Sequence, residues 1–245
     1  MLHHFYADPL QEDGREILLT PEDARHARTV LRLQAGDAVE LFSGGNRYLA
    51  RISRMDQKEV AVIREEQLPS TEPGLSVTLF QGLPKGDKMD WVVQKAVEAG
   101  VNRIVPLMMN RCIVQTDAKS RKAKTERWQR IAREAGKQCG RCRMPQVLEP
   151  VKMAEALPLM REAEALIVPW EDAVSYGPLS YAAEHPSVGS LGIVIGPEGG
   201  IEEEEIRLLK EAGAVTLTLG KRILRTETAG LVTVSALMAL YGEME

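Results

Sequence analysis

The chain has 245 residues, 44% hydrophobic and 27% charged, with a formal net charge of −4. This length accommodates one large or two modest domains, and the composition excludes an intrinsically disordered chain. The N-terminal residues lack a basic segment followed by an apolar one, so we expect no secretory signal. The longest apolar stretch, Ala229–Leu240, is shorter than the ~20 residues of a membrane span, and three cysteines cannot build a disulfide framework. We therefore expect a cytoplasmic protein with reduced thiols and no membrane association.

Up to about Gln67 the sequence indicates short strands and turns. Thr20-Pro21-Glu22-Asp23 is typical of the start of a short helix. Three alternating segments, 39–42, 47–53 and 59–66, are candidate strands, and the glycine turn between the first two predicts a hairpin. We therefore predict a small β-barrel domain over residues 1–70, followed by a linker within Leu68–Gly74.

After Gly74 the pattern changes to strands that alternate with helices. The candidate strands are Ser76–Gln81, Arg103–Met108, Ala165–Pro169, Leu191–Gly196 and Ala214–Leu219. The candidate helices are Lys88–Ala99, Thr125–Cys139, Lys152–Glu162, Glu202–Ala212 and Thr228–Gly242. This alternation predicts an α/β domain over residues 75–245, with a mainly parallel sheet covered by helices.

Three loops follow predicted strands, at the sheet edge where ligands of α/β proteins gather. In the first, Gln81–Lys88, lysines beside glycines suit a phosphate or backbone contact, although the local sequence favours a plain turn with surface lysines. The second, Ile195–Gly200, reads IGPEGG and precedes Glu202–Glu205, whose charges would repel a phosphate, so its ligand should be neutral or cationic. In the third, Leu219–Ala229, Thr226 or Thr228 is expected to cap the final helix.

Positive charge is concentrated between Lys119 and Arg143, where ten Lys or Arg and two Glu give a local balance of +8. The rest of the chain therefore carries −12. Such a segment is typical of a phosphate-backbone contact, but a solvated helix face has the same composition.

The loops together resemble a known family. IGPEGG, followed about 20 residues later by LGKRILRTETA, resembles the SPOUT-superfamily RNA methyltransferases, and among them the small-subunit (16S) ribosomal RNA uracil-N3 methyltransferases. QGLPKGDKMDWVVQKAVEAGV, EAGKQCGR and HARTVLRLQAGD are similar to further stretches of that family. The resemblance implies a PUA-like β-barrel followed by a SPOUT-type α/β domain with a C-terminal trefoil knot.

The resemblance also implies S-adenosylmethionine as cofactor. This molecule is a sulfonium cation without phosphate, which is consistent with the neutral or cationic ligand expected at the acidic glycine loop. The implied cofactor-binding residues are Pro169, Trp170, Ile195, Gly196, Pro197, Glu198, Gly199, Gly200, Leu219, Gly220, Ile223, Leu224, Thr228 and Ala229. The chain begins His3-His4-Phe5 where relatives commonly have an arginine, so no N-terminal RNA contact is assigned.

The basic segment fits this function as an RNA-binding helix. Trp128, Ile131, Ala132, Ala135 and Cys139 share one helical face, and Arg127, Arg130, Lys137 and Arg141 fall on another. The predicted RNA-binding residues are Arg32, Lys85, Lys88, Arg111, Arg130, Arg133, Lys137 and Arg141. The expected partner is small-subunit ribosomal RNA in the assembled subunit.

We predict Arg225 and Glu227 as the catalytic residues. Methylation at N3 of uracil requires loss of the N3 proton, so Arg225 would support the resulting charge and Glu227 would orient groups or help to remove the proton. We also expect a homodimer through the final helix, with Leu237 at the interface, because that helix is apolar on several sides.

Other functions are less well supported by the residues. Cys139-Gly140-Arg141-Cys142 has no second half that would complete a zinc site, so we expect no metal. A non-enzymatic ribosomal RNA-binding or assembly factor on the same fold is an alternative. A dinucleotide-dependent oxidoreductase is disfavoured because the glycine fingerprint is missing after the first strand.

Overall fold

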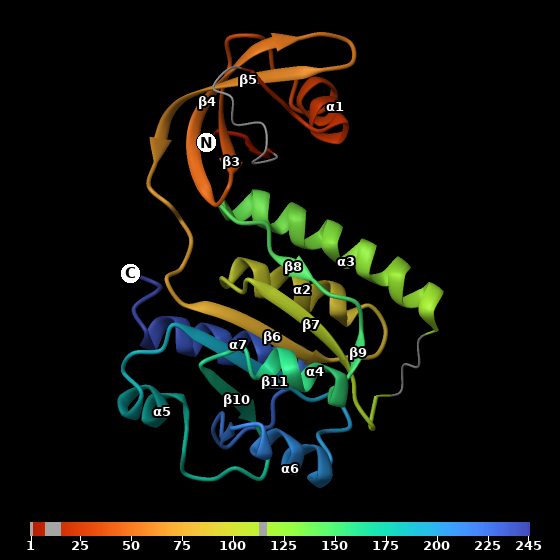
Figure 1. Ribbon diagram of the computed structural model, residues 1–245, viewed down its shortest axis with the longest axis vertical. Coiled ribbons are helices and arrows are strands. Elements are labelled where there is room, and N and C mark those ends of the chain that lie inside the picture. The colour runs from red at the N-terminus through yellow and green to blue at the C-terminus, as the bar shows by residue number, and fades with distance from the viewer. Residues whose placement is uncertain (1, 8–15, 113–116) are drawn as a thin grey trace. The chain divides into compact units, whose positions relative to one another are not determined.

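The computed structural model describes residues 2–7, 16–112 and 117–245, which form two compact units (Figure 1). Unit 1 comprises Met1–Glu72 and Gly136–Met144, and unit 2 comprises Pro73–Ala135 and Pro145–Glu245. The boundary after Glu72 falls inside the predicted linker. The return of the chain to unit 1 at residues 136–144 was not predicted.

Unit 1 contains a five-stranded sheet in the order β1-β3-β4-β5-β2. Its strands are β1 (His4–Tyr6), β2 (Ile17–Leu18), β3 (Ala38–Ser43), β4 (Asn46–Met55) and β5 (Val60–Leu68). The predicted hairpin is confirmed, because β3 and β4 pair antiparallel up to the Ser43–Asn46 turn. Helix α1 (Pro21–Thr29) also begins as predicted, with the Thr20 hydroxyl accepting a hydrogen bond from the backbone N–H of Asp23 at 3.2 Å.

Unit 2 contains a parallel sheet in the order β12-β10-β11-β6-β7-β8, with β9 also pairing with β7. Its strands are β6 (Ser76–Gly82), β7 (Arg103–Met108), β8 (Gln146–Val147), β9 (Val151–Lys152), β10 (Ala165–Pro169), β11 (Ser190–Ile195) and β12 (Ala214–Leu217). Every recorded strand pair of this sheet is parallel, which confirms the predicted α/β architecture. The trefoil knot stays a prediction.

Helices pack on both faces of this sheet. They are α2 (Lys88–Glu98), α3 (Ala118–Cys139), α4 (Met153–Met160), α5 (Pro178–Glu184), α6 (Glu203–Glu211) and α7 (Thr226–Leu240). On one face, Phe80 and Val194 of the strands share a core cluster with α4 and α6. On the other face α7 packs against β6 and β11, because Gly230 lies next to Leu79 and Ile195.

The final helix is more deeply buried in its own chain than the sequence suggests. Leu237 is fully buried within unit 2, so the prediction that it lies at a dimer interface is wrong. α7 packs against α2 and α5 as well as the sheet, and these neighbours cover its apolar sides. The apolar side chains that α7 leaves exposed are Val232 and Leu240, each 39% accessible.

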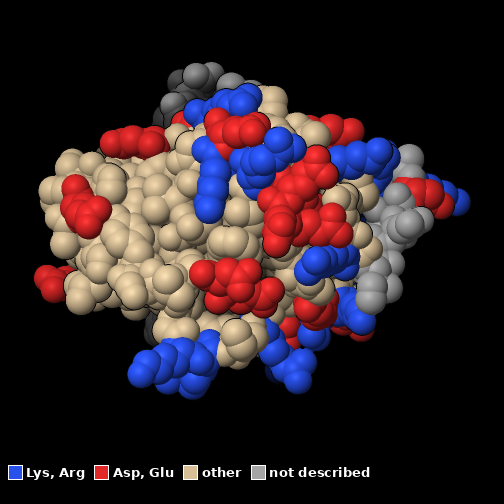
Figure 2. Space-filling view, turned by 90° about the horizontal axis from the view of Figure 1, so that it is seen from below, with Lys and Arg blue, Asp and Glu red and all other residues tan. Residues whose placement is uncertain are grey.

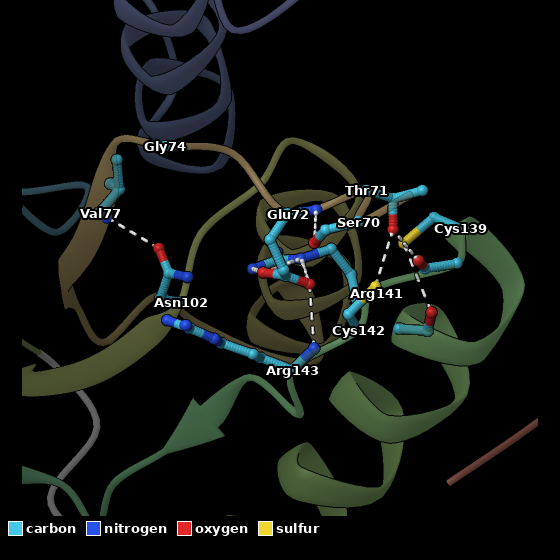
Figure 3. A network of polar contacts seen from close by, with 12 residues as sticks. Ser70, Thr71, Glu72, Gly74, Val77, Asn102, Cys139, Arg141, Cys142 and Arg143 are labelled. Atoms are coloured by element: carbon cyan, nitrogen blue, oxygen red, sulfur yellow. Dashed lines mark hydrogen bonds and ion pairs between the residues drawn. The ribbon is translucent and has the colours of Figure 1, made fainter. Parts of the chain in front are cut away.

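Helix α3 is longer than predicted and ends in a buried polar network of unit 1 (Figure 3). Gly140, with a φ of +76°, ends the helix, because this backbone conformation favours glycine. The Arg141 guanidinium then binds the Glu72 carboxylate at 2.8 and 3.1 Å, with the two side chains only 5% and 8% exposed. The prediction that Arg141 lies on an exposed basic helix face is therefore wrong.

The last turn of α3 is bound to unit 1 by two further contacts. The Lys137 ammonium group lies 2.5 Å from the buried Asp23 carboxylate, so Lys137 is not an exposed phosphate contact either. The His4 ring is 2.5 Å from the Lys137 carbonyl oxygen. His4 also lies 3.4 Å from Glu40. The N-terminal strand thus has a structural connection to α3.

The buried Glu72–Arg141 pair gives a prediction for stability. Burial acts to raise the pKa of Glu72, but the hydrogen bonds from Arg141 outweigh burial and lower that pKa below its usual 4.5. Glu72→Gln should destabilise unit 1 by about 3–5 kcal/mol, because it leaves the arginine charge buried without its partner. Hydrogen exchange of the β3–β4 amides measures this loss.

The pair should also make unit 1 acid-sensitive. Because the folded-state pKa of Glu72 is the lower one, its contribution is complete above the unfolded-state pKa and disappears as pH falls through the folded-state value. Glu65→Gln is the matched control, since the Arg51–Glu65 pair is exposed and its loss should leave exchange unchanged. Equal exchange in the two variants would contradict a stabilising role for the buried pair.

Candidate active site

A pocket of about 290 Å³ lies at the carboxyl ends of β10 and β11, beside the loop after β12 and the first turn of α7. Ligand sites of open α/β sheets occur at this edge. Twelve of the predicted cofactor residues line it: Pro169, Trp170, Ile195, Gly196, Pro197, Glu198, Gly200, Leu219, Gly220, Ile223, Leu224 and Ala229. Arg225 also lines it, together with Glu171, Ile201, Thr218, Arg222 and Thr226, which the sequence did not single out as pocket residues.

Gly199 and Thr228 are absent from the pocket lining. A Cβ on Gly199 would lie 2.9 Å from Cβ of Arg111, and the Arg111 guanidinium donates a hydrogen bond to the Gly199 carbonyl oxygen at 3.0 Å. Arg111, predicted as an RNA contact, therefore supports the glycine loop. Gly200 has a φ of +78°, so the turn of this loop requires a residue without a side chain.

The loop after β6 lies directly against the glycine loop. A Cβ on Gly82 would lie 2.6 Å from the backbone nitrogen of Pro197, closer than two such atoms can approach. Only glycine lets the two backbones meet at this distance. The end of β6 therefore forms part of the support for the pocket.

The Thr226 hydroxyl connects three elements at the base of the pocket. It donates a hydrogen bond to the Gly196 carbonyl oxygen at 2.6 Å and accepts one from the Gln81 side-chain amide at 2.8 Å. Gln81 and Thr226 are both buried. The prediction that a threonine caps α7 is wrong, because the N-cap residue is Arg225 and no side chain makes a capping bond there.

Lys88 connects the same elements at the surface. Its ammonium group donates to Glu198 at 3.0 Å and to Glu227 at 3.2 Å. The backbone N–H of Lys85 donates to Glu198 at 3.1 Å. Partial burial acts to raise the pKa of Glu198, but these hydrogen bonds outweigh it and lower the pKa. The hydrogen bonds to Glu198 and Glu227 in turn raise the pKa of Lys88 above its usual value.

The glutamates after the glycine loop stabilise local structure. Glu202 and Glu205 form a capping box at the start of α6, in which the Glu205 carboxylate accepts from the Glu202 backbone N–H at 3.1 Å. Glu205 also accepts from the backbone N–H of Asn110 at 3.0 Å, and Glu202 from the Asn110 amide at 2.9 Å. These two carboxylates thus anchor the segment after β7.

The remaining predicted RNA-binding residues are not among those that line the pocket. Arg130 is exposed on α3, and Arg133 is half-buried on the same helix. Lys85 is exposed in the loop after β6, and Arg32 is exposed in unit 1 with a φ of +55°. Arg127 on α3 is engaged with Asp90 of α2. The surface of α3 that stays available for an anionic ligand is therefore smaller than its composition suggests.

The described part of the chain contains no group of three His, Cys, Asp or Glu side chains that could hold a metal ion. None of the three cysteines, all within these residues, forms a disulfide. Within the same residues, no helix combines the length and apolar character that a bilayer crossing requires.

The chain matches the family model of an RNA methyltransferase domain over residues 71–238 and that of an RNA methyltransferase PUA domain over residues 19–63. It is similar to the ribosomal RNA small subunit methyltransferase E of Bacillus subtilis (strain 168), with 34% identity over 92% of this chain and 91% of that protein. The protein of the same name from Aquifex aeolicus (strain VF5) is 30% identical over 97% and 99% of the two chains.

A solved structure of a protein with the same name is also similar to this chain. The crystal structure of a ribosomal RNA small subunit methyltransferase E from Neisseria gonorrhoeae bound to S-adenosyl methionine has a TM-score of 0.86, with 34% identity and 98% coverage of each chain. The fold and the matched domains thus define an RNA methyltransferase with an N-terminal PUA domain. The chain belongs to the ribosomal RNA small subunit methyltransferase E family.

The Thr226 hydroxyl provides a test of how the pocket is held together. Thr226→Val keeps the shape of the side chain but leaves the Gln81 amide and the Gly196 carbonyl without their shared partner, which should cost about 1–3 kcal/mol in urea unfolding. Thr226→Ser retains the hydroxyl, so its free energy of unfolding should fall less than that of the valine variant. Equal stability of the valine variant and the wild type would show that the hydroxyl does not connect these elements.

Proposed function

We propose that this protein transfers the methyl group of S-adenosylmethionine to N3 of a uridine in small-subunit ribosomal RNA. The observation that carries the proposal is the pocket at the glycine loop, which twelve of the residues implied by the family resemblance line together. The similar protein from Neisseria gonorrhoeae is bound to S-adenosyl methionine. Such a reaction on ribosomal RNA belongs in the cytoplasm, and the assembled small subunit is the proposed form of the substrate.

The pocket suits a cofactor without phosphate. Its wall consists largely of glycine and apolar residues, whose backbone groups can contact an adenosine and a methionine moiety. Glu171 and Glu198 also line the pocket, and Lys88 compensates the charge of Glu198. Its volume is close to the lower end of the ~300–1,000 Å³ range of small-molecule sites.

Arg225 and Glu227, at the start of α7, are the proposed catalytic residues, although Glu227 is not among the residues that line the pocket. The bound cofactor supplies a methyl group on a positively charged sulfur. Arg225 is exposed at the N-cap, lines the pocket, and would support the negative charge that develops on the uracil oxygens when N3 loses its proton. Glu227 would accept the proton from N3, or would orient another group that accepts it. The target base must leave its stack or be unpaired to enter the pocket.

α3 and the loop after β6 are the proposed RNA contacts. Arg130 and Lys85 keep exposed side chains there, and Arg32 does so in unit 1. Lysine and arginine on such surfaces bind phosphates and contribute a salt-dependent part of the affinity. Lys137 and Arg141 are excluded from this surface, because their charges are neutralised within unit 1.

The function is tested with labelled S-adenosylmethionine, purified small subunits and naked ribosomal RNA. We expect label to accumulate at one uridine, as 3-methyluridine by mass spectrometry, with subunits as the better substrate. Arg225→Leu should lower kcat by about 10²–10³-fold. Arg222→Leu, also an exposed arginine of the pocket, is the matched control and should retain more activity. RNA binding without cofactor binding or methyl transfer would instead indicate a non-enzymatic assembly factor.

We also propose a homodimer through the exposed side of α7. Val232 and Leu240 are each 39% accessible there, and Leu179 of the neighbouring α5 is 71% accessible. Figure 2 shows a wide area with few charged side chains on the side where α5 and the end of α7 lie in Figure 1. An apolar area of this kind is typical of a surface covered by a partner.

Val232→Glu should convert the dimer to a monomer, because it places a carboxylate without a partner in an apolar contact. Sedimentation velocity at micromolar concentration measures the change. Leu18→Glu is the control, because Leu18 is equally exposed but lies in unit 1. A wild-type protein that sediments as a monomer would refute the proposed dimer.

A further inference from the structure

The end of β6, the glycine loop and the first turn of α7 are joined by two separate cross-links. The buried one is neutral and runs from Gln81 through Thr226 to the Gly196 carbonyl oxygen. The exposed one is ionic and runs from Lys88 to Glu198 and Glu227. Because the buried link already connects all three segments, the ionic one is not needed to bring them together. The ionic link must therefore have another role, and its position beside the pocket suggests what that role is.

The position of Lys88 is unfavourable for its own helix. Lys88 is the first residue of α2, where the helix dipole is positive and a cation is disfavoured. Helix stability therefore does not account for a lysine here. The two carboxylate partners of Lys88 account for it instead. Glu198 lies in the pocket lining, and Glu227 lies one residue after the buried Thr226.

Without the lysine, the two carboxylates would repel each other. Both approach the same ammonium group, so their charges are close together on either side of it. Glu198 is held on its other side by the Lys85 backbone N–H, whereas Glu227 has no second hydrogen bond recorded within the described residues. Loss of Lys88 would therefore displace Glu227 more than Glu198.

We propose that Lys88 is a positioning residue for the methyl transfer, which holds Glu227 and the first turn of α7 against the glycine loop. The inference rests on the proposed function, in which Arg225 and Glu227 from that turn act on the base. It differs from the sequence-based prediction that Lys88 contacts an RNA phosphate. The ammonium group already donates to two carboxylates, and their negative charges compensate its own and weaken its attraction for a phosphate.

The test compares Lys88→Met with Lys88→Arg, and with Lys95→Met as control. Lys95 is on the same helix and is similarly exposed, but it pairs with Glu98 of its own helix. With saturating RNA and S-adenosylmethionine, Lys88→Met should lower kcat by about 10- to 100-fold, the cost of a small misplacement of catalytic groups. The RNA KM and the calorimetric affinity for S-adenosylmethionine should stay close to wild type. Lys88→Arg should recover part of kcat, and the control should not change it.

Hydrogen exchange provides a readout that does not depend on activity. In Lys88→Met, the backbone amides of residues 225–229 should exchange faster than in wild type, while those of β6 and β11 should be unchanged. If the wild-type protein transfers no methyl group, the proposed function fails, but faster exchange in this variant still supports the positioning role of Lys88.

Two results would overturn the inference. Unchanged kcat, with a raised RNA KM and a salt dependence shallower by about 0.7–0.9 in slope, would make Lys88 a phosphate contact. Unchanged exchange at residues 225–229 would show that the ionic link does not hold the start of α7.

Discussion

The close approach of the β6 and β11 ends is the constraint on which the pocket depends. The two strands pair in parallel up to Ile195↔Gln81, so both chains leave the sheet at the same level. The absence of a side chain on Gly82 then lets the backbone of Pro197 pass within contact distance. This proximity places Gln81 under the start of α7, where Thr226 completes the connection. The glycine loop and the final helix are thus held to the sheet by one buried set of contacts.

Much of the fold of unit 2 could be predicted from sequence because its main strands are short apolar runs that alternate with helical patterns. The segments Arg103–Met108 and Ala165–Pro169 were predicted with the observed limits. Parallel pairing then places the strand ends at one edge, so the loops that line the pocket could also be named in advance. The hairpin of unit 1 was predictable for a similar reason, since its turn is set by Gly44 and Gly45.

The sequence could not predict which partners individual side chains would find. Helical spacing, continued past the predicted helix end at Cys139, placed Arg141 on a basic face, but its partner, Glu72, is distant in sequence. Leu237 belongs to a helix that is apolar on several sides, and a pattern of that kind does not say whether the same chain or a second copy covers a given side. A threonine before a helix can cap it, yet Thr226 uses its hydroxyl across the sheet instead. In each case the deciding contact is non-local.

The electrostatics of the glycine loop also depend on contacts that the sequence could not predict. Its glutamates suggest a strongly acidic site, but Glu202 and Glu205 are engaged at the start of α6, and the charge of Glu198 is compensated by Lys88. Little free negative charge therefore remains at the pocket. The proposed preference for a cofactor without phosphate then has a different origin. It follows from a lining in which glycine and apolar residues outnumber the two arginines, Arg222 and Arg225, so a phosphate group would lose its hydration with little compensation.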